Sequence, residues 1–357
     1  MGATSPRRTI RIAPFAVRLA YLLAALALFV LSLESLRLGA RPLVPFIREK
    51  ISIDNPVNAL GFGWLFAMAV LSGSPVAATA MTFLDAGVLN GQEAQAMIVG
   101  SRLGASFVVL FLGLVYVIRG HRSESSLAAG VLSLLVTQTT YLPAAVVASF
   151  ALSWGWTEGW GVGVLGSASS VLDRLLGPVT GLLNARVPSW GLFPLGLILL
   201  LLSFSVLDRS LPDLRRPGSR FGDLSHLLFR PAVTFALGAG ITLISLSVTV
   251  SLSLLVPLSA RGYIRKENAI PYIMGANVTT LVDTLFAAAL LGSPLGISVV
   301  LTLMVGVCLV SLVILLVVFR PYVRLLVGLT NWIAGGRRNL VLFLGLLAAA
   351  LITLILR

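Results

Sequence analysis

Residues 246–284 read LSVTVSLSLLVPLSARGYIRKENAIPYIMGANVTTLVDT, and residues 71–109 repeat their pattern without a gap as LSGSPVAATAMTFLDAGVLNGQEAQAMIVGSRLGASFVV. The two stretches are 175 positions apart, and identities between them are sparse. Two pairs of glycines keep the register: Gly87 with Gly262, and Gly100 with Gly275. Weak internal symmetry between apolar segments interrupted by Gly and Ser is typical of secondary transporters whose site lies between two repeats.

Composition places the chain in a membrane. Of its 357 residues, 57% are hydrophobic and only 11% are charged, and the mean hydropathy is +1.00. The apolar runs have the length of helical spans, about 20 residues, and lack the alternation expected of outer-membrane strands. One cysteine, Cys308, and two histidines, His121 and His226, exclude a disulfide framework and a Cys/His metal cluster.

The chain divides into six parts. We expect a basic tail at 1–13, a first transmembrane helix at 14–41, a first repeat at 42–118, connecting helices and loops at 119–230, a second repeat at 231–291, and C-terminal helices at 292–357. Each repeat is predicted to hold a hairpin and a helix. The segment at 154–183, rich in Gly and Trp, is expected to lie at the membrane interface.

The first hairpin is interrupted by Pro56, several glycines and the run LSGSP at 71–75, which do not suit one straight helix. We interpret it as a re-entrant hairpin that enters and leaves on one face, and the run 231–262 as its counterpart. Irregular backbone at membrane depth is tolerated only where protein or a water-filled cavity satisfies it. The interruptions therefore mark a candidate site.

Three crossings separate the two hairpins, and an odd number inverts the second repeat relative to the first. Most of the 26 Lys and Arg residues fall on the face that holds the amino terminus, so the positive-inside rule predicts a cytoplasmic amino terminus in an inner (cytoplasmic) membrane. The net charge of +13 therefore needs no nucleic acid partner. The predicted fold is an all-α polytopic membrane protein with two inverted-topology repeats, each with a re-entrant helical hairpin and a broken transmembrane helix.

The repeated motifs resemble those of the type II sodium/phosphate cotransporter family. That family carries Gln-Ser-Ser-Ser followed by Gly-(Ala/Ser)-Asn-Ile-Gly-Thr in both halves. Here LSGS at 71–74 and LSVT at 246–249 fall on the first motif, and GSRLGA at 100–105 and GANVTT at 275–280 fall on the second. The match covers about a third of the chain, and AIPYIMGAN at 269–277 is especially close.

The resemblance implies sodium-driven uptake of inorganic phosphate by alternating access, with Na⁺ as the coupling ion. This chain departs from the family pattern at residues that carry its chemistry. Leu71 and Leu246 replace the two Gln residues, Arg102 stands where the family has Asn, and Asp283 stands where it usually has Thr.

The charged residues Arg102 and Asp283 lie deep inside two predicted spans. Arg102 lies about ten residues, or about 15 Å, into its helix. Asp283 lies about sixteen residues, or about 24 Å, into a span that enters from the opposite face, which allows both residues to lie at a similar level in the bilayer. A guanidinium is a planar fork suited to phosphate-like oxygens, so Arg102 is a candidate anion clamp; the alternative is a permanent ion pair with Asp283 or a cap on broken-helix carbonyls. Asp283 could carry a coupling proton if desolvated, or stay ionised beside Arg102. Asp85, near a hairpin end, is expected to be a wetted interfacial carboxylate.

Polar side chains at the interruptions complete the candidate site. Ser72, Ser74, Ser247 and Thr249 offer hydroxyls beside half-helix N-termini, where unpaired amides favour anions, although Ser and Thr in membranes also serve packing. Asn277 joins them as a candidate for substrate binding. Oxygens of Asn277, Thr279 and Thr280 could ligate a coupling cation.

The sequence thus predicts a secondary carrier of a small anion, and phosphate is the first candidate for its substrate. Proton coupling, or exchange without a cation, is an alternative. A transport-inactive scaffold of the same fold is a second alternative, and a membrane enzyme acting on lipid is a third. No nucleophile and base are paired and no nucleotide-binding loop is visible, so we expect no enzyme and no bound cofactor. The oligomeric state stays open, and a homodimer is compatible with the sequence.

Overall fold

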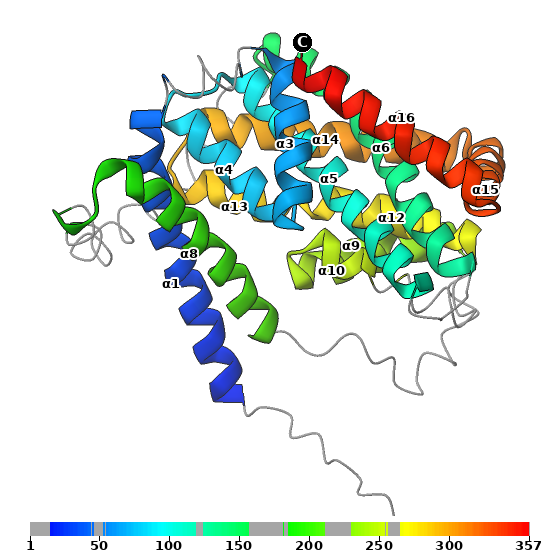
Figure 1. The fold of residues 1–357 in the computed structure, drawn as a ribbon, viewed down its shortest axis with the longest axis horizontal. Coiled ribbons are helices and arrows are strands. Elements are labelled where there is room, and N and C mark those ends of the chain that lie inside the picture. The colour runs from blue at the N-terminus through cyan, green and yellow to red at the C-terminus, as the bar shows by residue number, and fades with distance from the viewer. Residues whose placement is uncertain are drawn as a thin grey trace, which may run out of the picture.

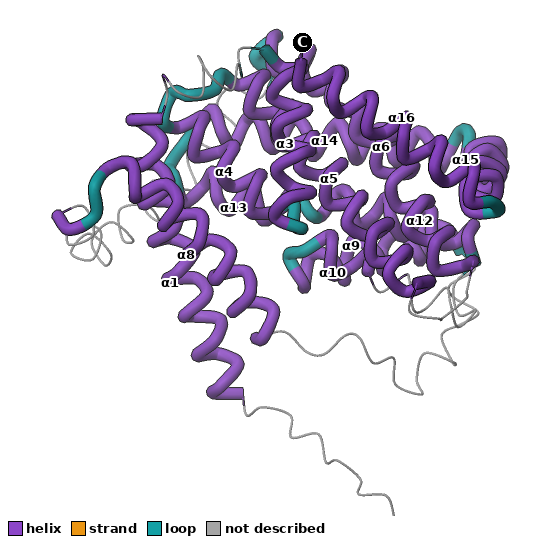
Figure 2. Tube along the Cα trace, viewed as in Figure 1, coloured by secondary structure: helices purple, strands orange, loops and turns teal. Residues whose placement is uncertain are grey.

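The computed structural model describes residues 15–43, 55–118, 124–156, 185–210, 230–253 and 265–356, with the single positions 45, 53, 181 and 255. Within these residues the secondary structure is helical throughout (Figures 1 and 2). In the described part of the chain, seven stretches are long and apolar enough to cross a bilayer: 17–40, 91–115, 127–153, 189–207, 266–290, 294–316 and 337–356. Their length and composition confirm the prediction of a helical membrane protein.

The first unit comprises α3 (Pro56–Val70), α4 (Ser74–Asp85) and α5 (Gly91–Ile118). Asn55 caps α3 by accepting hydrogen bonds from two backbone amides, and Pro56 suits the first helical turn because its missing N–H would be unpaired there. α3 ends where Leu71 adopts a left-handed conformation with φ +58°. Asn90 and Glu93 form a capping box that begins α5. The interruption predicted at 71–75 is therefore a real break between two helices.

The second unit comprises α9 (Pro231–Ser245), α10 (Val248–Ser253), α12 (Lys266–Thr279) and α13 (Leu281–Leu290). Pro231 again begins its first helix, and Leu246 again ends it in a left-handed conformation with φ +48°. Leu71 and Leu246 are the only non-glycine residues with positive φ among those described. Because this conformation costs an ordinary side chain about 1–2 kcal/mol, its recurrence at positions 175 apart reflects the same local fold.

The packing within each unit also recurs at this spacing. A Cβ on Gly100 would overlap the carbonyl oxygen of Leu60, and a Cβ on Gly275 would overlap that of Phe235, which is the position 175 residues on. The same correspondence holds for a second pair of contacts, Gly63 on the carbonyl of Met97 and Gly238 on the carbonyl of Tyr272. These glycines let α3 approach α5, and α9 approach α12, more closely than any side chain would permit.

The long span differs between the units. α5 runs unbroken through Arg102, whereas its counterpart is divided at Thr280 into α12 and α13. The prediction of a broken span in both repeats is therefore wrong for the first. Residues 278–280 of the second unit are all β-branched, while the first unit has Leu, Gly and Ala there, so the hydrogen-bond ladder is more easily interrupted in the second unit.

Contacts between the units are reciprocal. α4 of the first unit packs on α13, and α10 of the second unit packs on α5. Each helix that follows a break therefore lies against the long span of the other unit. The main hydrophobic core lies around these contacts and includes Met81, Met97 and Val300.

Outside the units, α1 (Phe15–Ala40) and α8 (Ser189–Ser210) form a closely packed antiparallel pair at one side of the molecule (Figure 1). Gly39 lies on the backbone of Phe193, and the Ser203 hydroxyl donates to the Ala25 carbonyl at 2.8 Å. Small residues at such an interface allow close helix approach. The prediction for 154–183 falls almost wholly outside the described residues.

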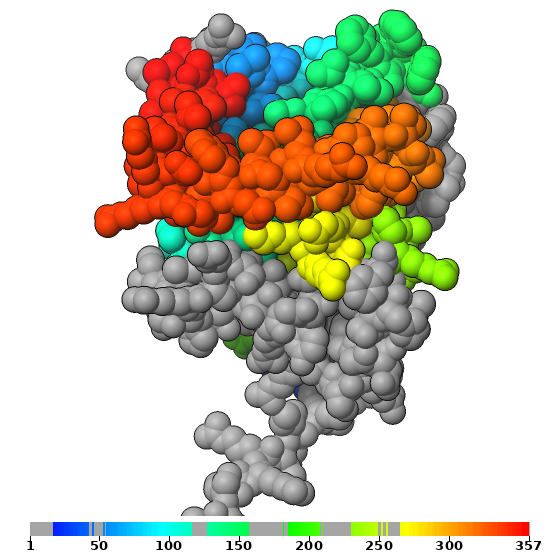
Figure 3. Space-filling model, turned by 90° about the vertical axis from the view of Figure 1, so that its right-hand side faces the viewer, coloured from blue at the N-terminus to red at the C-terminus, as the bar shows by residue number. Residues whose placement is uncertain are grey.

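The remaining helices cover the opposite side. α6 (Glu124–Ser153) packs on α5 and α14 (Pro294–Leu316) on α13, and α6 and α14 also contact each other. α15 (Phe319–Ala334) and α16 (Arg337–Leu356) follow. Figure 3 shows α14 and α15 as an orange band across this face, between α16 above and α12 below.

Candidate functional site

Arg102 and Asp283 meet in the interior. Arg102 is 1% exposed, and its Nη2 lies 2.9 Å from Asp283 Oδ1. The guanidinium also donates to Thr280 Oγ1 at 3.1 Å and to Thr284 Oγ1 at 2.6 Å, and the Thr284 hydroxyl donates to Asp283 Oδ1 at 2.8 Å. Every one of these partners belongs to the second unit, so a charge on α5 is held by side chains at and after the break between α12 and α13.

The helix breaks at Leu71 and Leu246 both lie beside this pair. A Cβ on Gly73, which precedes α4, would lie 2.7 Å from the carbonyl oxygen of Ser101, the residue before Arg102. At the second break, the Leu246 side chain and Asp283 line one cavity. In Figure 2 the two short loops lie one above the other near the centre of the view, consistent with these contacts. The breaks therefore converge on the buried charges.

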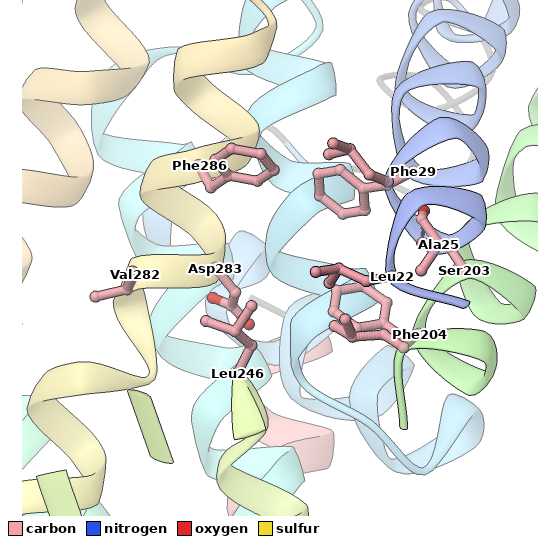
Figure 4. A pocket seen from close by; sticks show the side chains of 11 residues that line it. Leu22, Ala25, Phe29, Ser203, Phe204, Leu246, Val282, Asp283 and Phe286 are labelled. Atoms are coloured by element: carbon pink, nitrogen blue, oxygen red, sulfur yellow. Dashed lines mark hydrogen bonds between the residues drawn. The ribbon is translucent and has the colours of Figure 1, made fainter. Parts of the chain in front are cut away.

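The cavity occupies about 360 Å³ between α1, α8 and α13. Its wall consists almost entirely of apolar side chains, and Asp283 is its charged residue. Figure 4 shows Asp283 and Leu246 on one side of the view, with Leu22 and Phe204 across from them. The Ser203 hydroxyl, on the same wall, is already bonded to the Ala25 carbonyl.

Two polar atoms of the ion pair lack a hydrogen-bond partner. Among the described residues, Arg102 Nε and Asp283 Oδ2 are buried and have no hydrogen-bond partner. Such atoms are uncommon in buried networks, where a lost hydrogen bond costs about 1–3 kcal/mol. The pair is therefore enclosed by protein without being fully hydrogen-bonded.

Asn277 lies in a different cluster. Its amide Nδ2 donates to Thr137 Oγ1 at 3.3 Å and to Thr140 Oγ1 at 3.2 Å, and its backbone carbonyl accepts from the Tyr141 hydroxyl at 2.6 Å. These partners all lie on α6. The structure therefore places this candidate residue at a contact between α12 and α6, with its amide hydrogens directed to α6.

The hydroxyl residues at the breaks differ in their burial and in their hydrogen-bond partners. Ser74 is 4% exposed at the start of α4, and Ser72 is half-buried beside it. Ser247 begins the second break, where its carbonyl accepts from the Ser245 hydroxyl, and Thr249 lies in α10 with a side chain outside the described set. The Thr279 hydroxyl donates to the Ala239 carbonyl of α9 at 2.8 Å, so it ties α12 to α9. Thr280, a further candidate with a hydroxyl, accepts a hydrogen bond directly from Arg102.

Asp85 forms an ion pair with Arg37, whereas the sequence predicted a solvent-exposed carboxylate at the membrane interface. Its Oδ2 lies 2.6 Å from Arg37 Nε, and its side chain is 13% exposed. Because this pair joins the end of α4 to α1, burial against a neighbouring helix decides its environment.

Sequence reasoning missed several residues of the site. Thr284 follows Asp283 directly, and Thr137, Thr140 and Tyr141 form a polar cluster in an otherwise apolar helix. That cluster, TQTTY at 137–141, was a usable signal for a buried polar contact.

Among the described residues, no group of three or more His, Cys, Asp or Glu side chains could hold a metal ion. Comparison of the chain with protein-family models, with curated proteins and with solved structures finds no match.

Proposed function

We propose that this protein is a secondary carrier of a small anion, with inorganic phosphate as the first substrate to test. The observation that carries the proposal is Arg102, a buried guanidinium on one unit whose side-chain partners all lie on the other, between two helix breaks. Ionisable residues inside a membrane are costly and typically mark a transport pathway.

The packing supports two units of opposite orientation. Left-handed leucines and glycine contacts recur at a spacing of 175, and each post-break helix packs on the long span of the other unit. α1 and α8, which precede the two units, run antiparallel, as elements related by a two-fold axis within the membrane plane would. Inverted repeats of this kind provide alternating access around a central site. Re-entrant hairpins whose first helices end at Leu71 and Leu246 belong to the same proposal.

Asp283 occupies the place that the transported anion would take. It supplies one carboxylate oxygen to the guanidinium and leaves Arg102 Nε unpaired. An arriving phosphate would displace this internal counter-ion and accept from the fork that it vacates. The empty carrier thereby avoids an uncompensated buried charge, which would cost about 3–5 kcal/mol.

Coupling remains to be measured. Sodium is the ion that the resemblance implies, with Thr279 and Thr280 as its candidate ligands. Proton coupling is the alternative, with Asp283, the buried partner of Arg102, as the candidate carrier of the proton. A proton there would neutralise Asp283 and release Arg102 to an anion.

The decisive experiment is uptake of labelled phosphate into proteoliposomes under sodium or proton gradients. Arg102→Lys keeps the charge but loses the fork, so we expect uptake to fall at least tenfold, while Ser101→Ala, which changes the adjacent residue on α5, should retain it. Sulfate and organic anions are tested as competitors. Uptake that is unaffected by Arg102→Lys would refute the clamp.

A transport-inactive scaffold is the second candidate. The direct bond from Arg102 to Asp283 favours it, because a closed pair can serve stability alone. Absence of uptake of every anion tested, from a folded and correctly inserted protein, would select the scaffold.

A further inference from the structure

We propose that the outer face of α15 binds an anionic phospholipid, in which the phosphate is the only charged part of the head group. Arg320 and Arg324 would bind the phosphate, and the apolar side chains beside them would contact the acyl chains. This site goes beyond the proposed anion carrier and does not depend on it.

α15 connects two helices that are long and apolar enough to cross a bilayer. These are α14 and α16, whereas α15, with 16 residues, is not among the spans found in the described chain. α15 is seen nearly end-on in Figure 1, while α16 runs along the plane of the view, so α15 lies crosswise to the span that follows it. One span ends and the next begins on the same face of the membrane. A helix that joins them crosswise therefore lies at the bilayer surface.

Packing fixes the rotation of α15 about its axis. Its buried side chains recur at the spacing of one helical face: Val323, Leu326, Thr330 and Ile333. Hydrogen bonds also tie the helix to two neighbours. The Tyr322 hydroxyl lies 2.7 Å from Thr139 Oγ1 on α6, and Lys266 Nζ on α12 donates to Asn331 Oδ1 at 2.6 Å. The side chains opposite the buried face therefore point away from the protein.

This outer face divides into a basic flank and an apolar flank. At about 100° per residue, Arg320 and Arg324 lie on one side of it, and the other side carries three apolar residues. Leu325, Leu329 and Trp332 are 60%, 40% and 52% exposed, and both arginines are exposed. Interfacial helices place such an apolar flank among acyl chains and the cations at the head groups, where Trp is also enriched. The surface thus fits a lipid better than a water-soluble anion.

The charge of the two arginines is not balanced nearby in the sequence. Residues 284–357 contain five arginines and no aspartate or glutamate. Among the described residues, the side chains of Arg320 and Arg324 form no ion pair and no hydrogen bond. Their counter-ion therefore comes from outside the described chain, and at a bilayer surface an anionic lipid is the molecule of opposite charge.

The spacing of the arginines suits one phosphate group. They lie four residues, or about 6 Å, apart along the axis, and side chains at this spacing are neighbours on a helix. Each guanidinium can bind phosphate oxygens through its planar fork. Phosphatidylcholine also carries an ammonium group, and α15 has no acidic residue to receive it. A head group whose only charge is the phosphate avoids this repulsion, so the site should select it.

The test compares spin-labelled lipids that differ only in head group, with the full-length protein in phosphatidylcholine liposomes at about 0.15 M salt. The fraction of motionally restricted label measures the lipid bound to the protein. Each basic residue near anionic lipid contributes about fivefold to binding, so we expect phosphatidylglycerol to bind at least fivefold more tightly than phosphatidylcholine. Equal binding of the two lipids would refute the site. Glycerophosphoglycerol, the same head group without acyl chains, should not displace the label, and displacement would show a site for soluble phosphates instead.

Two pairs of substitutions locate the binding. Arg320→Gln with Arg324→Gln should bring the two lipids to within twofold of each other. The control, Arg209→Gln with Arg230→Gln, removes two exposed arginines at the end of α8 and the start of α9 and should keep the preference. Both pairs lower the net charge equally, so equal losses would show a general effect of charge and would overturn the site on α15. The comparison of lipids needs no substitution, so it decides even if a variant misfolds.

Discussion

Removal of one charge from the Arg102–Asp283 pair should destabilise the protein far more than removal of both. At their 2.9 Å separation and an effective dielectric constant of about 20, the two charges attract by roughly 6 kcal/mol. Arg102→Gln leaves the Asp283 carboxylate buried with the Thr284 hydroxyl as its remaining donor. Asp283→Asn leaves a buried guanidinium facing neutral oxygens of Thr280 and Thr284. Each single change should cost about 3–5 kcal/mol.

The double variant Arg102→Gln with Asp283→Asn has no buried charge and keeps the side-chain volumes. We expect its loss of stability to be smaller than that of either single variant, with a coupling of at least about 2 kcal/mol in the double-mutant cycle. Cys308 is the only cysteine, and it is half-buried in α14, so its reaction with a thiol dye reports unfolding without added labels. The assay is a denaturing-detergent titration of the four proteins. Additive losses would show that the two residues do not depend on each other, and the pair would then carry neither the fold nor the proposed displacement.

Three further predictions use the same stability assay. Gly100→Ala should destabilise the protein by about 3 kcal/mol or more, because the added Cβ would overlap the backbone of α3. The control Gly240→Ala on α9, where an added Cβ has no neighbour within 4 Å, should be neutral or stabilising. Equal effects of the two variants would refute close packing of α3 on α5. Leu71→Gly should relieve left-handed strain and be neutral or stabilising by about 1 kcal/mol, while Leu65→Gly, inside α3 and similarly exposed, should cost about 1 kcal/mol; a larger loss at Leu71 would contradict the break. Tyr141→Phe removes one buried hydrogen bond and should cost about 1–3 kcal/mol without affecting anion uptake, and lost uptake would give this hydroxyl a direct role.

The sequence predicts the local features of the fold well. The seven spans follow from apolar length, and the break at Leu71 follows from the Ser, Gly and Pro that surround it. The pairing of α1 with α8 could not be predicted, because it depends on contacts between residues such as Gly39 and Phe193 that no local pattern relates. The sequence also failed to predict that α5 is unbroken. The resemblance between the units concealed the different helix propensities of residues 103–105 in the first unit and 278–280 in the second.

The candidate site was only partly predictable. Helix rise places Arg102 and Asp283 at comparable depth, and both a clamp and an ion pair satisfy that constraint. Depth does not say which way each side chain points, and this rotation is set by packing of α5 on its neighbours. The role of Thr284 was hidden for a related reason, because a hydroxyl in a membrane helix can bond to its own backbone as readily as to a partner.

The two units share left-handed leucines and glycine contacts at a spacing of 175 residues but differ in their buried polar side chains, and the difference bears on how a carrier could work. Arg102 and Asn277 occupy equivalent positions 175 residues apart, and each reaches away from its own unit: Arg102 to side chains of α13, and Asn277 to hydroxyls on α6, which packs on the first unit. Relative motion of the units would strain both contacts at once. Under the proposed function, release of Arg102 from Asp283 is therefore part of the movement itself. An anion that binds the freed guanidinium then stabilises the moving state in preference to the resting state. This difference in affinity between two states is what any ligand-driven conformational change requires.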